Sequence, residues 1–159
     1  MAPDETVAEV RQHLTASPAR VFAAFAEASL VRRWLTPSPD VALRVVQFDF
    51  REGGAYRFAY DVPGGVTMFV NGVYRTIEPP STIVFSWNIE PPDEHAGVRS
   101  EVTVTLTPRG TGTDLRIRHA QLTLPGACER HEAGWRGALN HLVALLVEDY
   151  ERTSIPGEP

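Results

Sequence analysis

The chain of 159 residues contains no lysine, so arginine supplies all 15 of its basic side chains. The lysine amine forms Schiff bases with carbonyl substrates and pyridoxal phosphate, and it is the cation of phosphate-binding loops. The absence of lysine therefore excludes Schiff-base aldolases, pyridoxal enzymes and Walker-type nucleotide hydrolases.

Cysteine and long apolar runs are also scarce. Cys128 is the single cysteine, so the chain cannot form an internal disulfide, and a zinc site built from cysteines is not expected. The longest apolar run, residues 142–147, is far shorter than the roughly 20 residues that span a bilayer. The first residues carry neither the basic nor the apolar region of a signal peptide. These features predict a protein without a membrane span that resides in the cytoplasm.

Excess positive charge is lacking as well, since the formal net charge is −5. Nucleic-acid binding depends on neutralising phosphates, so no nucleic-acid partner is expected. The histidines show none of the close spacings that zinc and iron sites use, such as two histidines four apart on a helix. We therefore predict neither a metal nor another cofactor. The five histidines are His13, His95, His119, His131 and His141.

A long helical pattern occupies the C-terminal part of the sequence. Large apolar residues recur there at intervals of three or four, which places them on one face of a helix. This face needs a partner layer to cover it. The residues of this stripe are Trp135, Leu139, Leu142, Leu146 and Tyr150.

The N-terminal part predicts a strand and two short helices. Residues 6–14 alternate loosely, as in a strand. Ser17 can cap a helix whose first residue is Pro18, because proline is tolerated at that position. A second short helix is expected over residues 29–35, and the prolines that follow it prevent its continuation.

The middle of the chain alternates with a period of two, which predicts successive strands joined by short turns. Such strands form an antiparallel meander, and their alternation leaves one face solvated and the other to be covered by the long helix. We therefore expect an α+β fold with a curved antiparallel sheet of six to seven strands. The expected strands lie in 41–51, 56–60, 66–77, 82–89, 98–107 and 115–119.

The inward face of the 66–77 strand is left open by the pattern, because both of its faces are mixed. A slip of one residue exchanges Met68, Val70 and Tyr74 for the alternate set of positions.

Several short motifs follow one another along the chain. They are Phe22-Ala-Ala-Phe25, Arg33-Trp34-Leu35, residues 50–58, Gly72-Val73-Tyr74, Ile77-Glu78-Pro79-Pro80, residues 83–87, His119 and Glu132-Ala133-Gly134-Trp135. In this order they resemble the START-like "helix-grip" superfamily, and within it the branch named for the activator of heat-shock-protein ATPase. The resemblance implies that residues 1–159 are one START-like domain with an ordered core of about 6–152. Two short helices would lie between the first and second strands, and the sheet would pack on the long C-terminal helix.

In some members of this superfamily, the sheet and the long helix enclose a pocket for small apolar molecules. The resemblance and the aromatic inner face therefore predict binding of a small, largely apolar molecule, with no catalytic residue assigned. The expected ligand-binding residues are Trp34, Phe58, Met68, Val70, Tyr74, Phe85, Trp87, Val104, Ile117, His119, Trp135 and Leu139.

Two alternatives remain open at this point. An enzyme of the cyclase or hydrolase type would use the same cavity, with His119 acting beside Tyr74 or a carboxylate such as Glu132. A protein-interaction module of the co-chaperone type would use its outer surface. Homodimerisation and a chaperone partner are likewise left open.

Two residues have competing interpretations within this prediction. His119 shares the inner face of its strand, where it either satisfies a hydrogen bond of the core or orients a polar group of the ligand. Trp135 is expected to be mainly a core residue of the covering helix.

Overall fold

The computed structural model describes residues 6–153, in which seven antiparallel strands form one sheet with the order β1-β7-β6-β5-β4-β3-β2. The N-terminal strand thus pairs with the last one, and the other six form a meander. The strands are β1 (Ala8–Leu14), β2 (Ala42–Phe48), β3 (Ala55–Val62), β4 (Val66–Glu78), β5 (Thr82–Ile89), β6 (Arg99–Arg109) and β7 (Gly112–Ala120).

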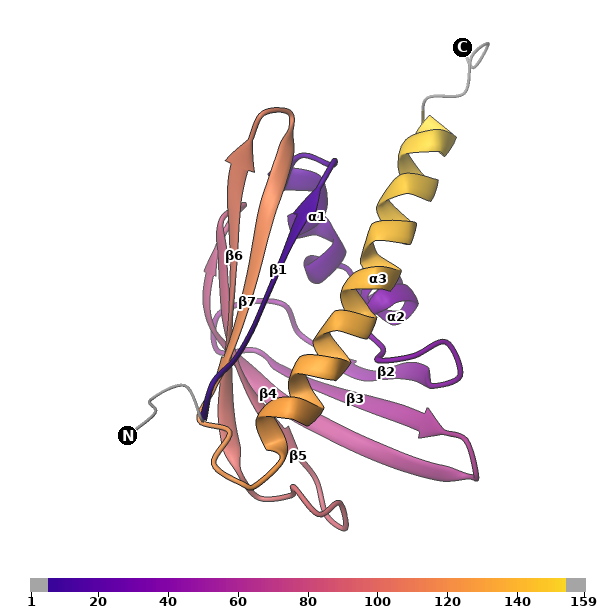
Figure 1. Cartoon of the computed structure of the whole chain (residues 1–159), viewed down its shortest axis with the longest axis vertical. Helices are drawn as coiled ribbons and strands as arrows, with labels where there is room; N and C mark the ends of the chain where they lie inside the picture. Colours follow the sequence, from indigo (N-terminus) through magenta and orange to yellow (C-terminus); the bar gives the residue numbers. More distant parts are fainter. Residues whose placement is uncertain (1–5, 154–159) are drawn as a thin grey trace.

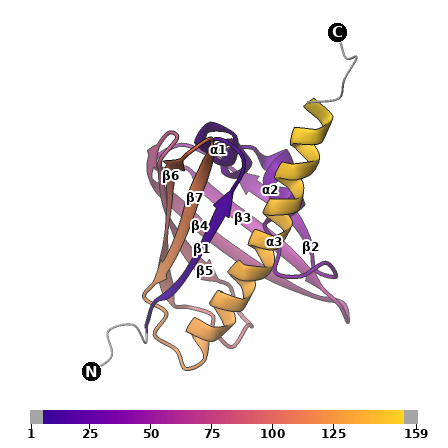
Figure 2. The ribbon, with the colours of Figure 1, turned by 45° about the horizontal axis from the view of Figure 1, so that its top comes forward.

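Three helices lie on one side of this sheet (Figure 1). They are α1 (Pro18–Ala26), α2 (Ala28–Trp34) and α3 (Ala127–Thr153). Helix α3 runs obliquely across the sheet, and Figure 2 shows β1 and β2, the two edge strands, on either side of it. This arrangement is the predicted α+β helix-grip fold, with two short helices between the first two strands.

Helix α1 begins as the sequence predicts. The Ser17 hydroxyl accepts a hydrogen bond from the backbone N–H of Arg20 at 3.3 Å, and Pro18 occupies the first helical position. Helix α3 begins earlier than its apolar stripe suggests, at Ala127. His131 therefore lies one turn inside the helix and not at its free N-terminal end.

The inward face of β4 is resolved by the structure. Val70 and Tyr74 are buried, whereas Val73 is 40% exposed. Strand β5 alternates strictly between buried and half-buried residues, as expected when one face of a sheet packs against helices. The core thus lies between this inner face and the three helices.

Helix α3 covers the core with the predicted stripe. Trp135, Leu139, Leu142 and Leu146 are buried. The fifth member of the stripe, Tyr150, lies outside the residues whose side chains are described, as do residues 1–5 and 154–159.

Candidate functional site

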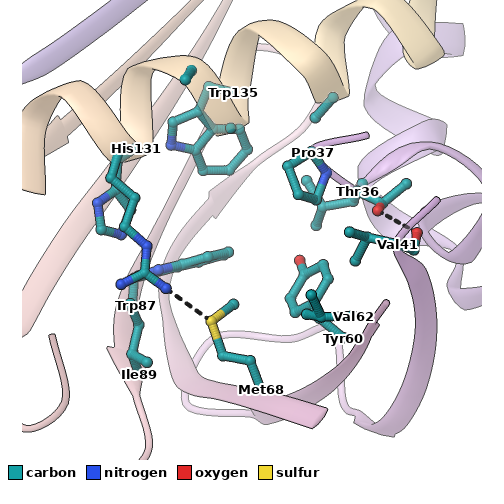
Figure 3. Close-up of a pocket in the computed structure, with 15 residues that line it drawn as sticks. Thr36, Pro37, Val41, Tyr60, Val62, Met68, Trp87, Ile89, His131 and Trp135 are labelled. Carbon is teal, nitrogen blue, oxygen red and sulfur yellow. Dashed lines mark hydrogen bonds between the residues drawn. The ribbon is translucent and has the colours of Figure 1, made fainter. Parts of the chain in front are cut away.

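A pocket of about 400 Å³ lies between α3 and the inner face of the sheet (Figure 3). Its walls come from the N-terminal half of α3, from the segment that follows α2, and from strands β3, β4 and β5. Most of its lining is apolar. The lining residues are Leu35, Thr36, Pro37, Val41, Tyr60, Val62, Met68, Trp87, Ile89, Arg130, His131, Ala133, Gly134, Trp135 and Ala138.

Two tryptophans form one wall of the pocket. Trp87 points inward because it lies on the buried face of β5, and Trp135 belongs to the inner stripe of α3. Their ring centroids are 5.6 Å apart at an interplanar angle of 50°. The pair offers apolar faces that suit a flat ligand.

A network of buried hydrogen bonds holds the Trp135 indole in place. Its indole Nε1–H donates to His119 Nδ1 at 3.0 Å, and His119 Nε2 lies 2.7 Å from the Ser100 hydroxyl. Ser100 in turn donates to the Trp87 carbonyl oxygen at 2.9 Å. Since an indole can only donate, His119 Nδ1 must accept, and Nε2 must carry the proton. Both ring nitrogens of His119 are therefore engaged.

The His119 imidazole is held neutral. Its side chain is fully buried, and this desolvation lowers its pKa well below the ordinary value, with the neighbouring His131 adding to the effect. The hydrogen bond from Trp135 also requires the unprotonated Nδ1. His119 has the properties of a satisfied core histidine, and its hydrogen-bond partners are a serine and a tryptophan.

His131 is a lining residue that the sequence did not predict to contact a ligand. It is buried, and its Nδ1 donates to the Ala127 carbonyl oxygen at 2.8 Å. Its ring meets that of His119 edge-on, with centroids 4.6 Å apart. Burial is the main cause that lowers the His131 pKa, and Arg130 contributes in the same direction. The earlier start of α3 explains why the sequence pattern missed this burial.

An ion pair closes the pocket margin next to His131. The two terminal nitrogens of Arg130 donate to the two carboxylate oxygens of Asp93 at 2.7 and 2.8 Å. The Arg130 Nη2 also donates to the Met68 sulfur at 3.1 Å, a contact drawn as the dashed line to the sulfur in Figure 3. These hydrogen bonds from Arg130 are the largest cause that lowers the pKa of Asp93, to about 2. The 90–97 loop, which carries Asp93, is thereby tied to α3.

Tyr60 brings a hydroxyl group to the opposite side of the pocket. Its ring is buried on the inner face of β3, and Figure 3 shows the oxygen directed into the space between the walls. Thr36, nearby in the lining, donates its hydroxyl to the Val41 carbonyl oxygen at 2.7 Å.

The structure brings three of the twelve predicted ligand-binding residues into the pocket lining: Met68, Trp87 and Trp135. The other nine are buried outside that lining, and their contact with a ligand stays a prediction. Trp34 is an example of a residue buried outside the lining. Its indole N–H donates to the Ala24 carbonyl oxygen at 2.9 Å within the core. The nine are Trp34, Phe58, Val70, Tyr74, Phe85, Val104, Ile117, His119 and Leu139.

Several lining residues escaped the sequence prediction. Tyr60 and Ile89 could have been found, because each continues an alternating inward row of its strand. The segment 35–41 carries no periodic signal, and only the folded chain shows that it reaches the pocket.

The geometry does not assemble the acid–base pair of the enzyme alternative. His119 is saturated with hydrogen bonds, and Glu132 is partly exposed on α3 and paired with Arg136 at 3.1 Å. Within residues 6–153, no group of three or more potential metal ligands converges, and no helix is long and apolar enough to cross a membrane.

Residues 15–147 match the family model described as Activator of Hsp90 ATPase homolog 1-like protein. No curated protein matches the chain significantly.

Solved structures share the architecture. A Rhizobium loti protein is 33% identical, covering 87% of this chain and 95% of its own, with a TM-score of 0.70. A Chromobacterium violaceum protein is 27% identical, with coverages of 88% and 96% and a TM-score of 0.79. The AHSA1 protein of Silicibacter pomeroyi is 22% identical, with coverages of 90% and 99%; its TM-score of 0.80 indicates the same fold.

Proposed function

The chain belongs to the Activator of Hsp90 ATPase homolog 1-like family, and from that membership and the pocket under α3 we propose that it binds a small, largely apolar molecule. The observation that carries the proposal is the pocket itself, whose volume of about 400 Å³ suits a small organic ligand. Trp87, Trp135, Met68 and Ile89 would supply the apolar contacts.

The proposal explains why the aromatic side chains of the pocket wall border a cavity and are not covered by other side chains. A core without a ligand role gains stability from close packing, and each unfilled space costs contacts. Here, segment 35–41 and α3 stand away from the sheet and leave the faces of Trp87 and Trp135 lining open space. Filling that space with an apolar ligand would remove their surface from water and stabilise the complex.

A pocket-filling variant tests the proposal. Gly134 lines the pocket, and a Cβ placed there meets only the Pro37 side chain, at the ordinary distance of 3.8 Å. Gly134→Leu should fill the pocket and weaken binding of the neutral dye N-phenyl-1-naphthylamine at least about 10-fold, measured by dye fluorescence. A loss of that size corresponds to about 1.4 kcal/mol of binding free energy.

Ala144→Leu is the matched control, since it adds the same kind of side chain to an exposed position of the same helix. It should bind the dye like the wild-type protein. If the wild-type protein does not bind the dye, or if Gly134→Leu binds it with unchanged affinity, the proposal is wrong.

A further inference from the structure

Two inward-facing tyrosines on β3 differ in how their hydroxyl groups are used. The Tyr56 hydroxyl donates to the Ser86 carbonyl oxygen at 2.6 Å. The Tyr60 hydroxyl faces the pocket, and no group in the described part of the chain forms a hydrogen bond with it. A hydroxyl group that lacks a hydrogen-bond partner at a largely water-excluded surface contributes most to binding free energy when the bound molecule supplies that partner.

Other polar side chains of the lining already form hydrogen bonds within the protein. Thr36 donates to Val41, the His131 Nδ1 donates to Ala127, and Arg130 donates to Asp93. The Trp87 indole N–H has no hydrogen-bond partner, but this nitrogen is itself buried. Tyr60 is therefore a donor in the lining that a ligand can engage without breaking an internal hydrogen bond.

Charge at the pocket margin selects against an anion. The guanidinium of Arg130 is already matched by the two oxygens of Asp93, and this pairing lowers the Asp93 pKa to about 2, so the carboxylate stays ionised. A ligand carboxylate would enter a mostly apolar space without an uncompensated cation to receive it, which is costly.

The Tyr60 hydroxyl also keeps its proton. Burial raises the pKa of this phenol further above its ordinary value, so the group remains a neutral donor at physiological pH.

We propose that the ligand of this pocket is an apolar, ring-containing molecule with an uncharged oxygen acceptor, such as a ketone, that accepts a hydrogen bond from Tyr60. This inference rests on the proposed function and adds three properties to it: rings, an acceptor at a defined place, and the absence of a negative charge.

Two probes that differ by one carbonyl group test the acceptor. Fluorene has only the rings, whereas 9-fluorenone has the same rings and a ketone. Binding can be followed through quenching of protein fluorescence, since Trp87 and Trp135 line the pocket. Tyr60→Phe should weaken fluorenone binding about 3- to 10-fold, as expected for one hydrogen bond, and leave fluorene binding unchanged.

Tyr56→Phe is the control. Tyr56 is the other inward-facing, buried tyrosine of β3, but its hydroxyl donates to the Ser86 carbonyl oxygen and it lies outside the pocket lining. Removing its hydroxyl should change the binding of neither probe. A loss of fluorenone affinity in Tyr56→Phe, or equal losses for both probes in Tyr60→Phe, would overturn the assignment to Tyr60.

Infrared spectroscopy supplies a readout that does not depend on affinity. A hydrogen bond to the ketone lowers its stretching frequency, so the carbonyl band of fluorenone bound to the wild-type protein should lie below that of fluorenone bound to Tyr60→Phe. Identical bands in the two proteins contradict the proposed hydrogen bond.

The charge preference is tested with fluorene-9-carboxylate and the variant Asp93→Asn. The wild-type protein should bind this anion at least about 10-fold more weakly than fluorenone, which corresponds to about 1.4 kcal/mol. Asp93→Asn removes the partner charge of Arg130 and should narrow that difference. Tighter binding of the carboxylate by the wild-type protein would overturn the preference for an uncharged ligand.

The acceptor inference and the proposed function are refuted by different results. If the wild-type protein binds the dye and both neutral probes, but the affinity for fluorenone does not depend on Tyr60, only the acceptor inference is refuted. Failure of the wild-type protein to bind the dye refutes the proposed function and the inference that rests on it.

Discussion

At the level of single residues, His119 connects more of the fold than any other polar side chain described above. Lying on β7, it accepts from Trp135 of α3 and donates to Ser100 of β6, which donates to the backbone of β5 at Trp87. One imidazole thus ties three adjacent strands to the helix that covers them. A buried network in which every member is satisfied rigidifies its surroundings.

The variant His119→Phe tests this structural role. It leaves the Trp135 indole N–H without an acceptor, and an unsatisfied buried donor costs roughly 1 to 3 kcal/mol. We expect a decrease of that size in the free energy of unfolding, measured with urea. The control His13→Phe alters an exposed histidine and should have a small effect. Unchanged stability of His119→Phe together with lost ligand affinity would instead assign His119 to the ligand.

Buried histidines also predict how stability depends on pH. The pKa values of folded His119 and His131 lie below the unfolded value of about 6.5, so below that pH the unfolded chain binds more protons. The contribution of these two neutral histidines to the free energy of unfolding is therefore complete above pH 6.5 and is lost as the pH falls toward their pKa values in the folded protein. Urea unfolding between pH 7.5 and 5 should show this decrease, and His131→Gln should reduce it. A free energy of unfolding that is constant over this range contradicts the prediction.

At the level of elements, two glycines of α3 shape the pocket in opposite ways. The backbone of Pro37 packs so closely on the helix that a Cβ at Gly137 would overlap the Pro37 carbonyl oxygen. At Gly134 the same atom would make only an ordinary contact, at 3.8 Å from the Pro37 side chain. Gly137 therefore lets the 35–41 segment reach α3, whereas Gly134 leaves room beside it.

The alanine variants of these glycines form a matched pair. Gly134→Ala should raise the free energy of unfolding by about 0.5 to 1 kcal/mol, because alanine is the better helix former. Gly137→Ala gains the same propensity but must displace Pro37, so we expect a net loss of about 1 to 3 kcal/mol. Thermal unfolding of both variants measures the difference. Equal changes in the free energy of unfolding in the two variants would show that the 35–41 segment moves aside without loss of stability.

The elements were largely predictable because their signals are local. Alternation places Phe85 and Trp87 on the buried face of β5, and Ser17 with Pro18 marks the start of α1. The apolar stripe did not locate the N-terminus of α3, because the first turn of this helix, from Ala127, carries no large apolar residue of the stripe. The inward face of β4 was undecided, and pairing with β3 and β5 fixed it.

At the level of the whole molecule, the pocket exists because segments distant in the sequence meet there. Tyr60 of β3, Pro37 of the segment after α2 and Trp135 of α3 face one another across it (Figure 3). The sheet bends beneath α3, and its two edges lie on either side of the helix (Figure 2).

Ligand binding should therefore stabilise the whole fold. A ligand that binds only the folded state at 100 times its Kd adds about 2.7 kcal/mol. For a domain of this size, the melting temperature should rise by roughly 5 to 10 °C in saturating 9-fluorenone. Gly134→Leu, whose pocket is filled, should show little or no rise. An equal rise in both proteins would place the ligand elsewhere.

The sequence by itself determined the class of the molecule: a lysine-free chain with an antiparallel sheet, a covering helix and family motifs. It also determined that Trp87 and Trp135 face the interior, since side-chain direction follows from local periodicity. The inward direction of Met68 was decided only by the pairing of β4 with β3 and β5. Only the tertiary structure decided which interior residues border open space and which are packed. That distinction depends on how far segment 35–41 and α3 stand from the sheet, and no local pattern encodes a distance between elements.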